Sequence, residues 1–381
     1  PIIGGSMRAA VASVSAVIVT IFFIQLGNGL QTSLLSVRAG FEAFPAAVLG
    51  IIMASYYVGY SAAPLMSRTI IGRFGHVAVM GVGAFFAALA ILLHPLLVSP
   101  IIWCVLRVIS GFALSSLYVG AESWIHDRVG NAERGRVFSV YMVAQMVAMT
   151  GSQLLLSIGN PHHIGPFVLA GALILIGGLP VLIARHTAPD RAPPQPFGFI
   201  KLFHASPLGA IVTVLAGVTW SIVFTFGPAY AQRSGFDLTQ TSIFMALAML
   251  GGALIQFPVG WLSDAVGRRV TIALLSVGGL AAALFGLWAD GQGDVIKYVA
   301  SFLAGGLIFP MYVVSVAHTN DRIAPENRVA AAAGMVLLFG LGSIFGPLVA
   351  GGAVTGMGTG GYYTVLAATL AASLAVAAIA R

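Results

Sequence analysis

The sequence predicts an all-α integral membrane protein with twelve transmembrane helices, from three observations. Of its 381 residues, 59% are hydrophobic and only 8% are charged, whereas a water-soluble domain carries about 25% charged residues. Its charge-free stretches are long enough to cross a bilayer, which takes roughly 20 apolar residues as a helix. Two parts of the sequence also repeat one another. The composition excludes a cytosolic enzyme, a nucleic-acid binder and a disordered protein.

Seven charge-free stretches of 20 to 33 residues provide one crossing each. The stretches after Arg136 and Arg328 are about twice as long, and each folds back at a glycine-rich breaker. The segment 101–124, interrupted by Arg107, is the remaining crossing. The predicted helices cover residues 11–34, 45–66, 76–96, 100–124, 136–158, 165–184, 206–231, 239–262, 270–289, 296–318, 329–353 and 362–380.

The longest polar connection is rich in proline and lies between the sixth and seventh predicted helices. It predicts an N-terminal six-helix bundle over 7–184, a cytoplasmic linker over 185–205 and a C-terminal six-helix bundle over 206–381. Residues 1–6 precede Met7 and are left out of the fold prediction.

The positions of the basic residues predict how the chain is oriented in the membrane. With the N-terminus inside the cell, 14 of the 18 Lys and Arg residues fall at cytoplasmic positions, as the positive-inside rule requires. Both termini are then cytoplasmic. The net charge of +7 therefore reports topology, and the expected partner is the lipid bilayer, with no nucleic acid.

The internal repeat is a sequence similarity between the fourth and tenth predicted helices. A shift of 194 residues, without a gap, superposes Gly111 on Gly305, Tyr118 on Tyr312, Asp127 on Asp321, Arg128 on Arg322 and Arg134 on Arg328. Parallel repeats of six helices are one way in which transporters are built. The repeat therefore predicts two pseudo-symmetric halves.

Three motifs then resemble those of the major facilitator superfamily. Residues 260–269, GWLSDAVGRR, resemble its signature loop, Gly-x-Leu-x-Asp-x-x-Gly-Arg-Arg/Lys. Arg107 and Gly111 resemble the Arg-x-x-x-Gly motif of helix four. Residues 342–352, GSIFGPLVAGG, resemble the Gly-Pro motif usually met in helix five of antiporters, although here they lie in helix eleven. The resemblance spans the chain and implies the fold of that superfamily.

The loop after helix two departs from the signature, because Gly72 occupies the Asp position and Arg68 the first Gly position. The segments 27–29, 122–124 and 134–136 resemble a branch of small bacterial facilitators whose substrates are mostly unassigned. This resemblance implies a multi-pass monomer in the bacterial inner membrane.

Helix four carries a polar stripe. Its members fall within an arc of about 80° and are Arg107, Gly111, Ser115, Tyr118 and Glu122. Arg107 and Glu122 are about 22 Å apart along the helix axis and cannot pair directly. Intramembrane charges mark functional sites by default.

Two interpretations of each charge stay open. Arg107 is a counter-charge for a substrate anion or a member of a proton-coupling network, or else a structural arginine bonded to neighbouring helices. Glu122 carries a proton, since burial favours the protonated carboxyl, or it is a gate residue paired with Arg128 or Arg136.

Further polar and aromatic residues in the spans are candidates for lining a central cavity. Aromatic residues in spans, however, more often pack against other helices or anchor the helix at the membrane interface. These candidates are Asn28, Gln31, Tyr56, Tyr60, Ser115, Tyr118, Gln145, Trp220, Gln256 and Tyr312. Helix one carries Gln25, Asn28 and Gln31 with no acid. Drug antiporters of the superfamily commonly keep a carboxylate there, which lowers the expectation of cationic-drug efflux.

The signature loop predicts a conformational latch. Gly260 and Gly267 permit close approach and a tight turn, and Asp264 accepts hydrogen bonds from helix-terminal amides and an arginine, with Arg268 and Arg269 following. In the superfamily this latch favours the state closed to the cytoplasm. Gly342, Gly346, Pro347 and Gly351 predict close packing of helix eleven against a neighbour.

The leading functional hypothesis is a secondary active transporter that moves a small organic solute by alternating access. We expect proton coupling and favour efflux over uptake. The alternative is a lipid flippase or lipid carrier of the same fold. The sequence holds no nucleotide-binding loop and no catalytic or metal-ligand constellation, so we expect neither an enzyme nor a cofactor or metal.

Overall fold

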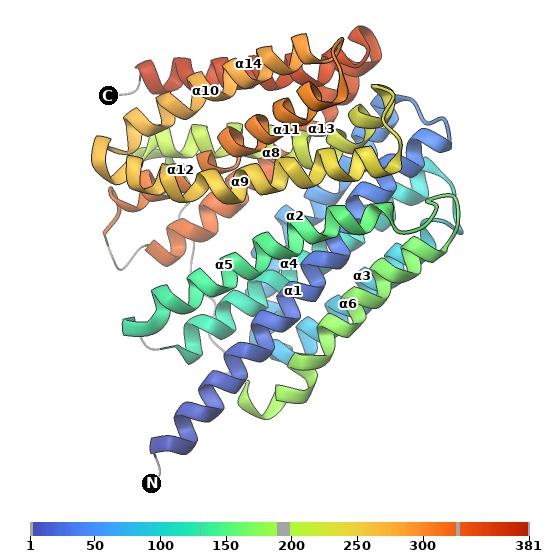
Figure 1. The fold of residues 1–381 in the computed structure, drawn as a ribbon. Coiled ribbons are helices and arrows are strands. Elements are labelled where there is room, and N and C mark those ends of the chain that lie inside the picture. Colours follow the sequence, from blue (N-terminus) through green and yellow to red (C-terminus); the bar gives the residue numbers. More distant parts are fainter. Residues whose placement is uncertain (1–2, 130, 189–198, 325–327, 380–381) are drawn as a thin grey trace. The chain divides into compact units, whose positions relative to one another are not determined.

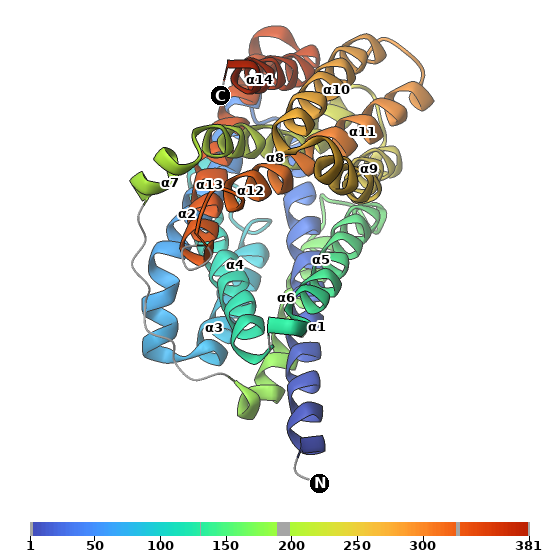
Figure 2. The ribbon, with the colours of Figure 1, turned by 90° about the vertical axis from the view of Figure 1, so that its left-hand side faces the viewer.

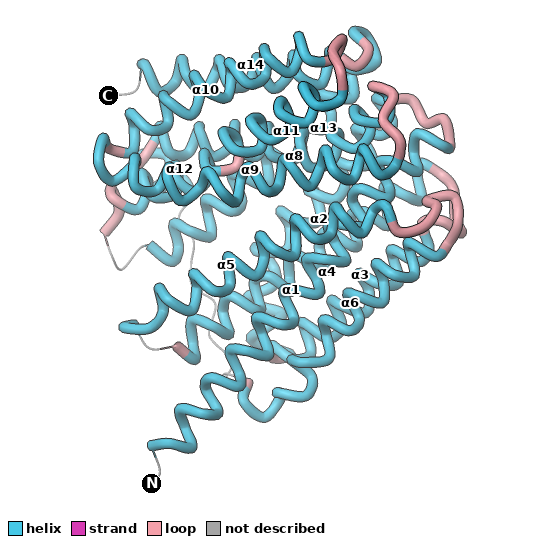
Figure 3. Tube along the Cα trace, in the orientation of Figure 1, coloured by secondary structure: helices cyan, strands magenta, loops and turns pink. Residues whose placement is uncertain are grey.

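The computed structural model describes residues 3–129, 131–188, 199–324 and 328–379, and this part is helical with short connections (Figures 1 and 3). The all-α prediction is confirmed. The α-helices are α1 (Ile3–Phe41), α2 (Ala46–Phe74), α3 (His76–Leu93), α4 (Pro100–Arg128), α5 (Asn131–Leu154), α6 (Gly165–Ile183), α7 (Phe199–Ala205), α8 (Pro207–Arg233), α9 (Leu238–Val266), α10 (Arg268–Ala289), α11 (Asp294–Ile308), α12 (Pro310–Asn320), α13 (Arg328–Met357) and α14 (Gly360–Ile379).

Twelve stretches of the described residues are long and apolar enough to cross a membrane. Nine of them lie in single α-helices. Ser139–Ser157 and Gly165–His186 each run from an α-helix into the 3-10 turn that follows it, and Asp294–Asn320 combines α11 and α12. Twelve predicted crossings therefore correspond to twelve observed ones. Two short 3-10 turns, Leu155–Ser157 and Ala184–Thr187, follow α5 and α6.

Several helix ends lie up to eight residues from the predicted ones, as in α1, which ends at Phe41, and α2, which ends at Phe74. Beyond these shifts, the structure differs from the predicted elements in two places. The predicted continuous helix over 296–318 is interrupted between Ile308 and Pro310, because proline has no N–H to donate and its ring clashes with the preceding turn. The predicted linker ends in a short helix, α7. The rest of its proline-rich part, 189–198, lies outside the described residues, as do Pro1, Ile2 and the side chains of Arg134 and Arg136.

Contacts divide the chain into two units. Unit 1 comprises Pro1–Leu34 and Val58–Pro194, and unit 2 comprises Leu35–Tyr57 and Gln195–Arg381. The division into bundles over 7–184 and 206–381 stays a prediction. Within unit 1, α3 packs against both α4 and α6. Within unit 2, α8 packs against α13, α9 against α11 and α10 against α14, which run side by side in Figures 1 and 2.

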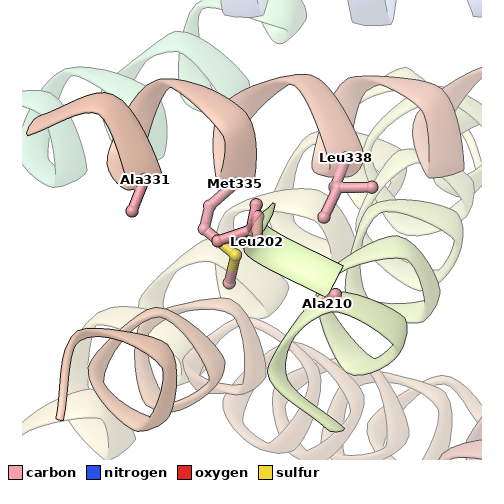
Figure 4. Packing of buried hydrophobic residues seen from close by; sticks show 5 residues of the cluster. All are labelled: Leu202, Ala210, Ala331, Met335 and Leu338. Carbon is pink, nitrogen blue, oxygen red and sulfur yellow. The ribbon is translucent and has the colours of Figure 1, made fainter. Parts of the chain in front are cut away.

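A buried apolar cluster joins three helices of unit 2 (Figure 4). Ala331, Met335 and Leu338 recur at spacings of four and three along α13, which puts them on one helix face. Leu202 of α7 and Ala210 of α8 pack against this face. Burial of these side chains fixes α7, at the end of the linker, against α8 and α13.

Asp290, directly after α10, ties together helix ends of unit 2. Its carboxylate accepts hydrogen bonds from Tyr230 Oη at 2.7 Å, Ser234 Oγ at 2.9 Å and Thr359 Oγ1 at 2.6 Å. Lys297 Nζ donates to the carbonyl oxygen of Ser234 at 3.0 Å. We call these five residues the Asp290 hub. It connects the end of α8, the α10–α11 connection and the start of α14.

Candidate functional site

Helix α1 presents a buried amide face in unit 1. Gln25, Asn28 and Gln31 recur every three residues and therefore lie near one face of the helix. Their side chains are 8%, 5% and 0% exposed. A polar side chain facing lipid costs several kcal/mol, so this face turns inward. The amide nitrogen and oxygen of Gln31 are buried and have no hydrogen-bond partner within the described part of the chain.

Tyr118 of α4 links two of these amides. Its hydroxyl donates to Oε1 of Gln25 and accepts from Nδ2 of Asn28 at 3.4 Å. The phenol thus uses its donor and its acceptor at once. The structure thereby brings the predicted residues Asn28 and Tyr118 together and adds Gln25 between α1 and α4.

A second polar contact joins α1 to α5 through residues that the sequence analysis missed. Ser33 Oγ donates to Gln153 Oε1 at 2.6 Å, and Gln153 Nε2 donates to Ser152 Oγ at 3.0 Å. The helices approach closely here, since a Cβ at Gly29 would collide with Ser152. The predicted Gln145 is half-buried, and its amide contacts Met142 Sδ of its own helix at 3.9 Å. Gln153 lies eight residues further along α5. The signal that could have identified it is a polar side chain within an apolar span.

Glu122 lies at the other end of the α4 stripe with an exposed side chain. Tyr141 of α5, which is 1% exposed, directs its hydroxyl at Glu122 Oε1 at 3.5 Å. Tyr60 and Tyr118 are close enough to Tyr141 to act on it electrostatically. Tyr141 therefore contacts the predicted residue Glu122 and lies within electrostatic range of the predicted residues Tyr60 and Tyr118. Arg128, one of the predicted partners of Glu122, donates instead to the carbonyl oxygen of Ala188 at 2.6 Å.

Arg107 is fully buried in α4, and Ser115 on the same stripe is 2% exposed. The positive charge of Arg107 acts on His94, which follows α3. His94 Nδ1 lies 2.6 Å from the carbonyl oxygen of Ala90. The indole of Trp103 donates to the carbonyl oxygen of His94 at 3.0 Å. No sequence pattern singles out His94, because its partners are set by the packing of α3 on α4.

Two of the candidates in unit 2 share an aromatic cluster. Trp220 of α8 contacts the rings of Phe224, Phe309 and Phe339, with centroids 5.0, 5.2 and 6.0 Å away. Tyr312 contacts Phe339 at 4.8 Å. Trp220 and Tyr312 therefore meet through Phe339, at the break between α11 and α12.

The remaining candidates, Tyr56 and Gln256, belong to unit 2. Tyr56 is 5% exposed, and its ring meets that of Tyr57 edge to face at 5.2 Å. Gln256 is half-buried on α9.

The signature loop between α9 and α10 forms an ion-pair network. Arg268 Nη1 contacts Asp264 Oδ1 at 2.5 Å, and its Nε contacts Asp321 Oδ2 at 3.2 Å. Arg269 donates to the carbonyl oxygens of Ala377 and Ala378 at 2.9 and 3.0 Å, which satisfies the C-terminal end of α14. A cleft of about 450 Å³ lies among these side chains, with His318 and Arg322 also lining it. The loop thus binds the ends of α9, α10, α12 and α14 together.

The two glycines of this loop differ. Gly267 adopts a φ of 91°, which only glycine takes without strain, and it provides the turn. A Cβ at Gly260 would meet nothing within 4 Å, so the close approach expected there is not found among the described residues.

Helix α13 packs through its glycines. A Cβ at Gly342 would collide with the carbonyl oxygen of Val214, and one at Gly346 would lie 2.5 Å from that of Val218. Both carbonyls belong to α8. On another side, Cβ atoms at Gly50 and Gly351 would lie 2.5 and 2.6 Å from the carbonyl oxygens of Pro347 and Ala46. These contacts are the close approach that small residues allow.

The fold and motifs have clear relatives. A profile described as "Major Facilitator Superfamily" matches residues 7–347. The chain is 24% identical over 334 residues to the "Uncharacterized MFS-type transporter YcaD" of Escherichia fergusonii, covering 86% of this chain and 85% of that protein. It is 24% identical over 325 residues to YfkF of Bacillus subtilis, which carries the same description, with 81% and 79% covered.

Solved structures share the fold. The nucleoside transporter NupG superposes with a TM-score of 0.78 at 18% identity, covering 96% of this chain and 97% of that one. A bacterial homologue of the human lysosomal transporter Spinster, in an inward-facing and unoccupied conformation, gives a TM-score of 0.73 at 16% identity, with 98% and 95% covered. With twelve spans, the signature loop and a matching profile over residues 7–347, the chain belongs to the major facilitator superfamily of membrane transporters.

Proposed function

We propose that this protein is a secondary active transporter that moves a small polar organic solute by alternating access, coupled to protons. We place it as a monomer in a bacterial inner membrane with both termini cytoplasmic, and favour efflux over uptake. The observation that supports this most directly is Gln31, whose amide is fully buried without a partner in the described part of the chain. A buried amide without a partner costs about 1–3 kcal/mol, and a solute that bonds it removes that cost.

The amide face of α1 suggests the solute class. Gln25, Asn28 and Gln31 present N–H donors and C=O acceptors and carry no charge. Such a face suits a neutral solute rich in hydrogen-bonding groups. NupG is a nucleoside transporter, and nucleosides have this chemistry. The alternative, a lipid carrier, requires an apolar cleft, and the buried amides favour a polar solute.

Glu122 is the proposed proton carrier. It lies on the same helix face as Tyr118, which bonds the amide face, and Tyr141 contacts it. This arrangement puts a titratable carboxyl on the helix face that also carries the amide-bonded Tyr118. Arg107, fully buried on the same helix, is the proposed charged member of the coupling network.

A thermal-shift screen of the detergent-purified protein tests the solute class. We expect a neutral hydrogen-bonding solute, such as a nucleoside, to raise the apparent Tm, since a ligand at 100 times its Kd stabilises the folded state by about 2.7 kcal/mol. Gln31→Leu removes the amide at similar volume and should abolish most of this shift while the protein stays folded.

The matched control is Gln292→Leu, because Gln292 is exposed in the connection between α10 and α11. That variant should retain the full shift. An equal shift in Gln31→Leu and in the unsubstituted protein would contradict the role of Gln31. Stabilisation by lipids alone, with no response to any polar solute, would favour the lipid-carrier alternative.

A further inference from the structure

An apolar groove runs between α3 and α6 in unit 1, and none of its described lining residues belongs to the amide face. Its volume is about 610 Å³. Val77, Ala78 and Val82 of α3 form one wall, and Leu182 of α6 forms the other. Val82 is 54% exposed and Leu182 is 43% exposed, so the groove opens to the outside of the unit.

Small residues create the groove. Gly81 has no side chain to fill it, and a Cβ there would lie 3.2 Å from Leu182 Cδ2. Ala78 is exposed and short. Nearby the same two helices pack closely, since a Cβ at Gly178 would lie 3.2 Å from that of Ala84. The helices therefore touch at one level and leave room at another.

One end of the groove is basic. Arg185 and His186, directly after α6, line it and are exposed. Phe74 lines it too, and the guanidinium of Arg73 lies 5.4 Å from the centre of the Phe74 ring. None of the described residues that line the groove is acidic. The groove thus combines apolar walls with a cationic end.

We propose that this groove binds an anionic phospholipid, with an acyl chain between α3 and α6 and the phosphate head group at Arg185, His186 and Arg73. The walls belong to two membrane spans, His76–Leu93 and Gly165–His186, so lipid is what these helices meet. The cations lie where the spans end, at the level of head groups. Lys and Arg at that level attract anionic lipids. In the topology predicted from the basic residues, this end faces the cytoplasm, where the leaflet is anionic.

Lipid titration of the detergent-purified full chain tests the proposal. Binding of dioleoyl phosphatidylglycerol and dioleoyl phosphatidylcholine is counted by native mass spectrometry, and the apparent Tm is followed in parallel. We expect the anionic lipid to bind more tightly. Arg185→Gln should weaken its binding about five-fold, as the loss of one juxtamembrane cation predicts, and should leave phosphatidylcholine binding unchanged.

The matched control is Arg233→Gln, because Arg233 is an exposed arginine at the end of α8 in unit 2. That variant should bind phosphatidylglycerol as the unsubstituted protein does. Ala78→Leu fills the apolar wall at an exposed position and should weaken both lipids. Inorganic phosphate at the same concentration should not compete, because it has no acyl chain.

Equal binding of the two lipids, or unchanged phosphatidylglycerol binding in Arg185→Gln, would overturn the proposal. Competition by inorganic phosphate would also overturn it, since the site would then be for a free anion. None of these outcomes depends on Gln31 or on solute transport.

Discussion

Single polar residues in this protein act through partners far away in the sequence. Asp290 accepts hydrogen bonds from Tyr230, Ser234 and Thr359, residues 56 to 69 positions away. Tyr118 bonds Gln25, 93 positions away. The composition of the spans indicated Tyr118 as a polar candidate, because a polar residue in lipid needs a partner. Asp290, His94 and Gln153 were missed, because their roles come from packing that no local pattern encodes.

The Asp290 hub predicts acid-dependent stability. Burial acts to raise the pKa of Asp290, but hydrogen bonds from Thr359, Tyr230 and Ser234 and the charge of Lys297 outweigh it, so the pKa lies below its ordinary value. Because the folded state favours the ionised carboxylate, Asp290 stabilises the protein at pH values above the unfolded-state pKa of about 3.9. This contribution is lost as the pH falls from there through the folded pKa. Thermal unfolding in detergent below about pH 4 should show a steeper loss of Tm in the unsubstituted protein than in Asp290→Asn.

Asp294→Asn provides the control for this measurement. Asp294 begins α11, four residues further on, and is exposed. We expect the Tm of Asp294→Asn to change with pH as the Tm of the unsubstituted protein does. Identical acid profiles for Asp290→Asn and the unsubstituted protein would show that the hub carboxylate does not contribute.

The helices themselves were predictable because lipid imposes a simple length rule. The lengths of the charge-poor stretches predicted twelve spans, and twelve are found among the described residues, since a crossing needs about 20 apolar residues. The interruption at Pro310 was missed, because counting uncharged residues records length and ignores backbone hydrogen bonds. The sequence predicted that α13 packs closely through its glycines. Only the structure shows that its partners are α8 and the start of α2.

Glycine substitutions in α13 test this packing. Gly342→Ala places a methyl group against the carbonyl oxygen of Val214, and overpacking of this kind typically costs 1–3 kcal/mol. We expect a clear fall in the apparent Tm. The same substitution at Gly352, where a Cβ meets nothing within 4 Å, should change stability by less than about 1 kcal/mol. Equal effects of the two substitutions would show that α13 does not depend on close contact with α8.

At the scale of the whole molecule, the family and fold were predictable and the solute was not. The repeat of helix four as helix ten and the signature loop at residues 260–269 identified the superfamily, and the matching profile and solved structures agree. Those features encode the shared scaffold. In the proposed function the solute is selected by a few side chains, such as Gln25, Asn28 and Gln31, whose common buried face appears only when the helices pack.

The most direct test of the account is proton-driven transport in reconstituted vesicles. The solute identified by thermal shift is supplied with and without an imposed pH gradient, and counterflow exchange is measured separately. We predict that the gradient drives accumulation by the unsubstituted protein. Glu122→Gln should abolish accumulation and keep counterflow, because a permanently neutral side chain still lets the carrier change conformation. Glu42→Gln, which removes a carboxylate paired with Arg38 at the end of α1, should behave as the unsubstituted protein. Unchanged gradient-driven accumulation in Glu122→Gln would contradict proton coupling through this residue.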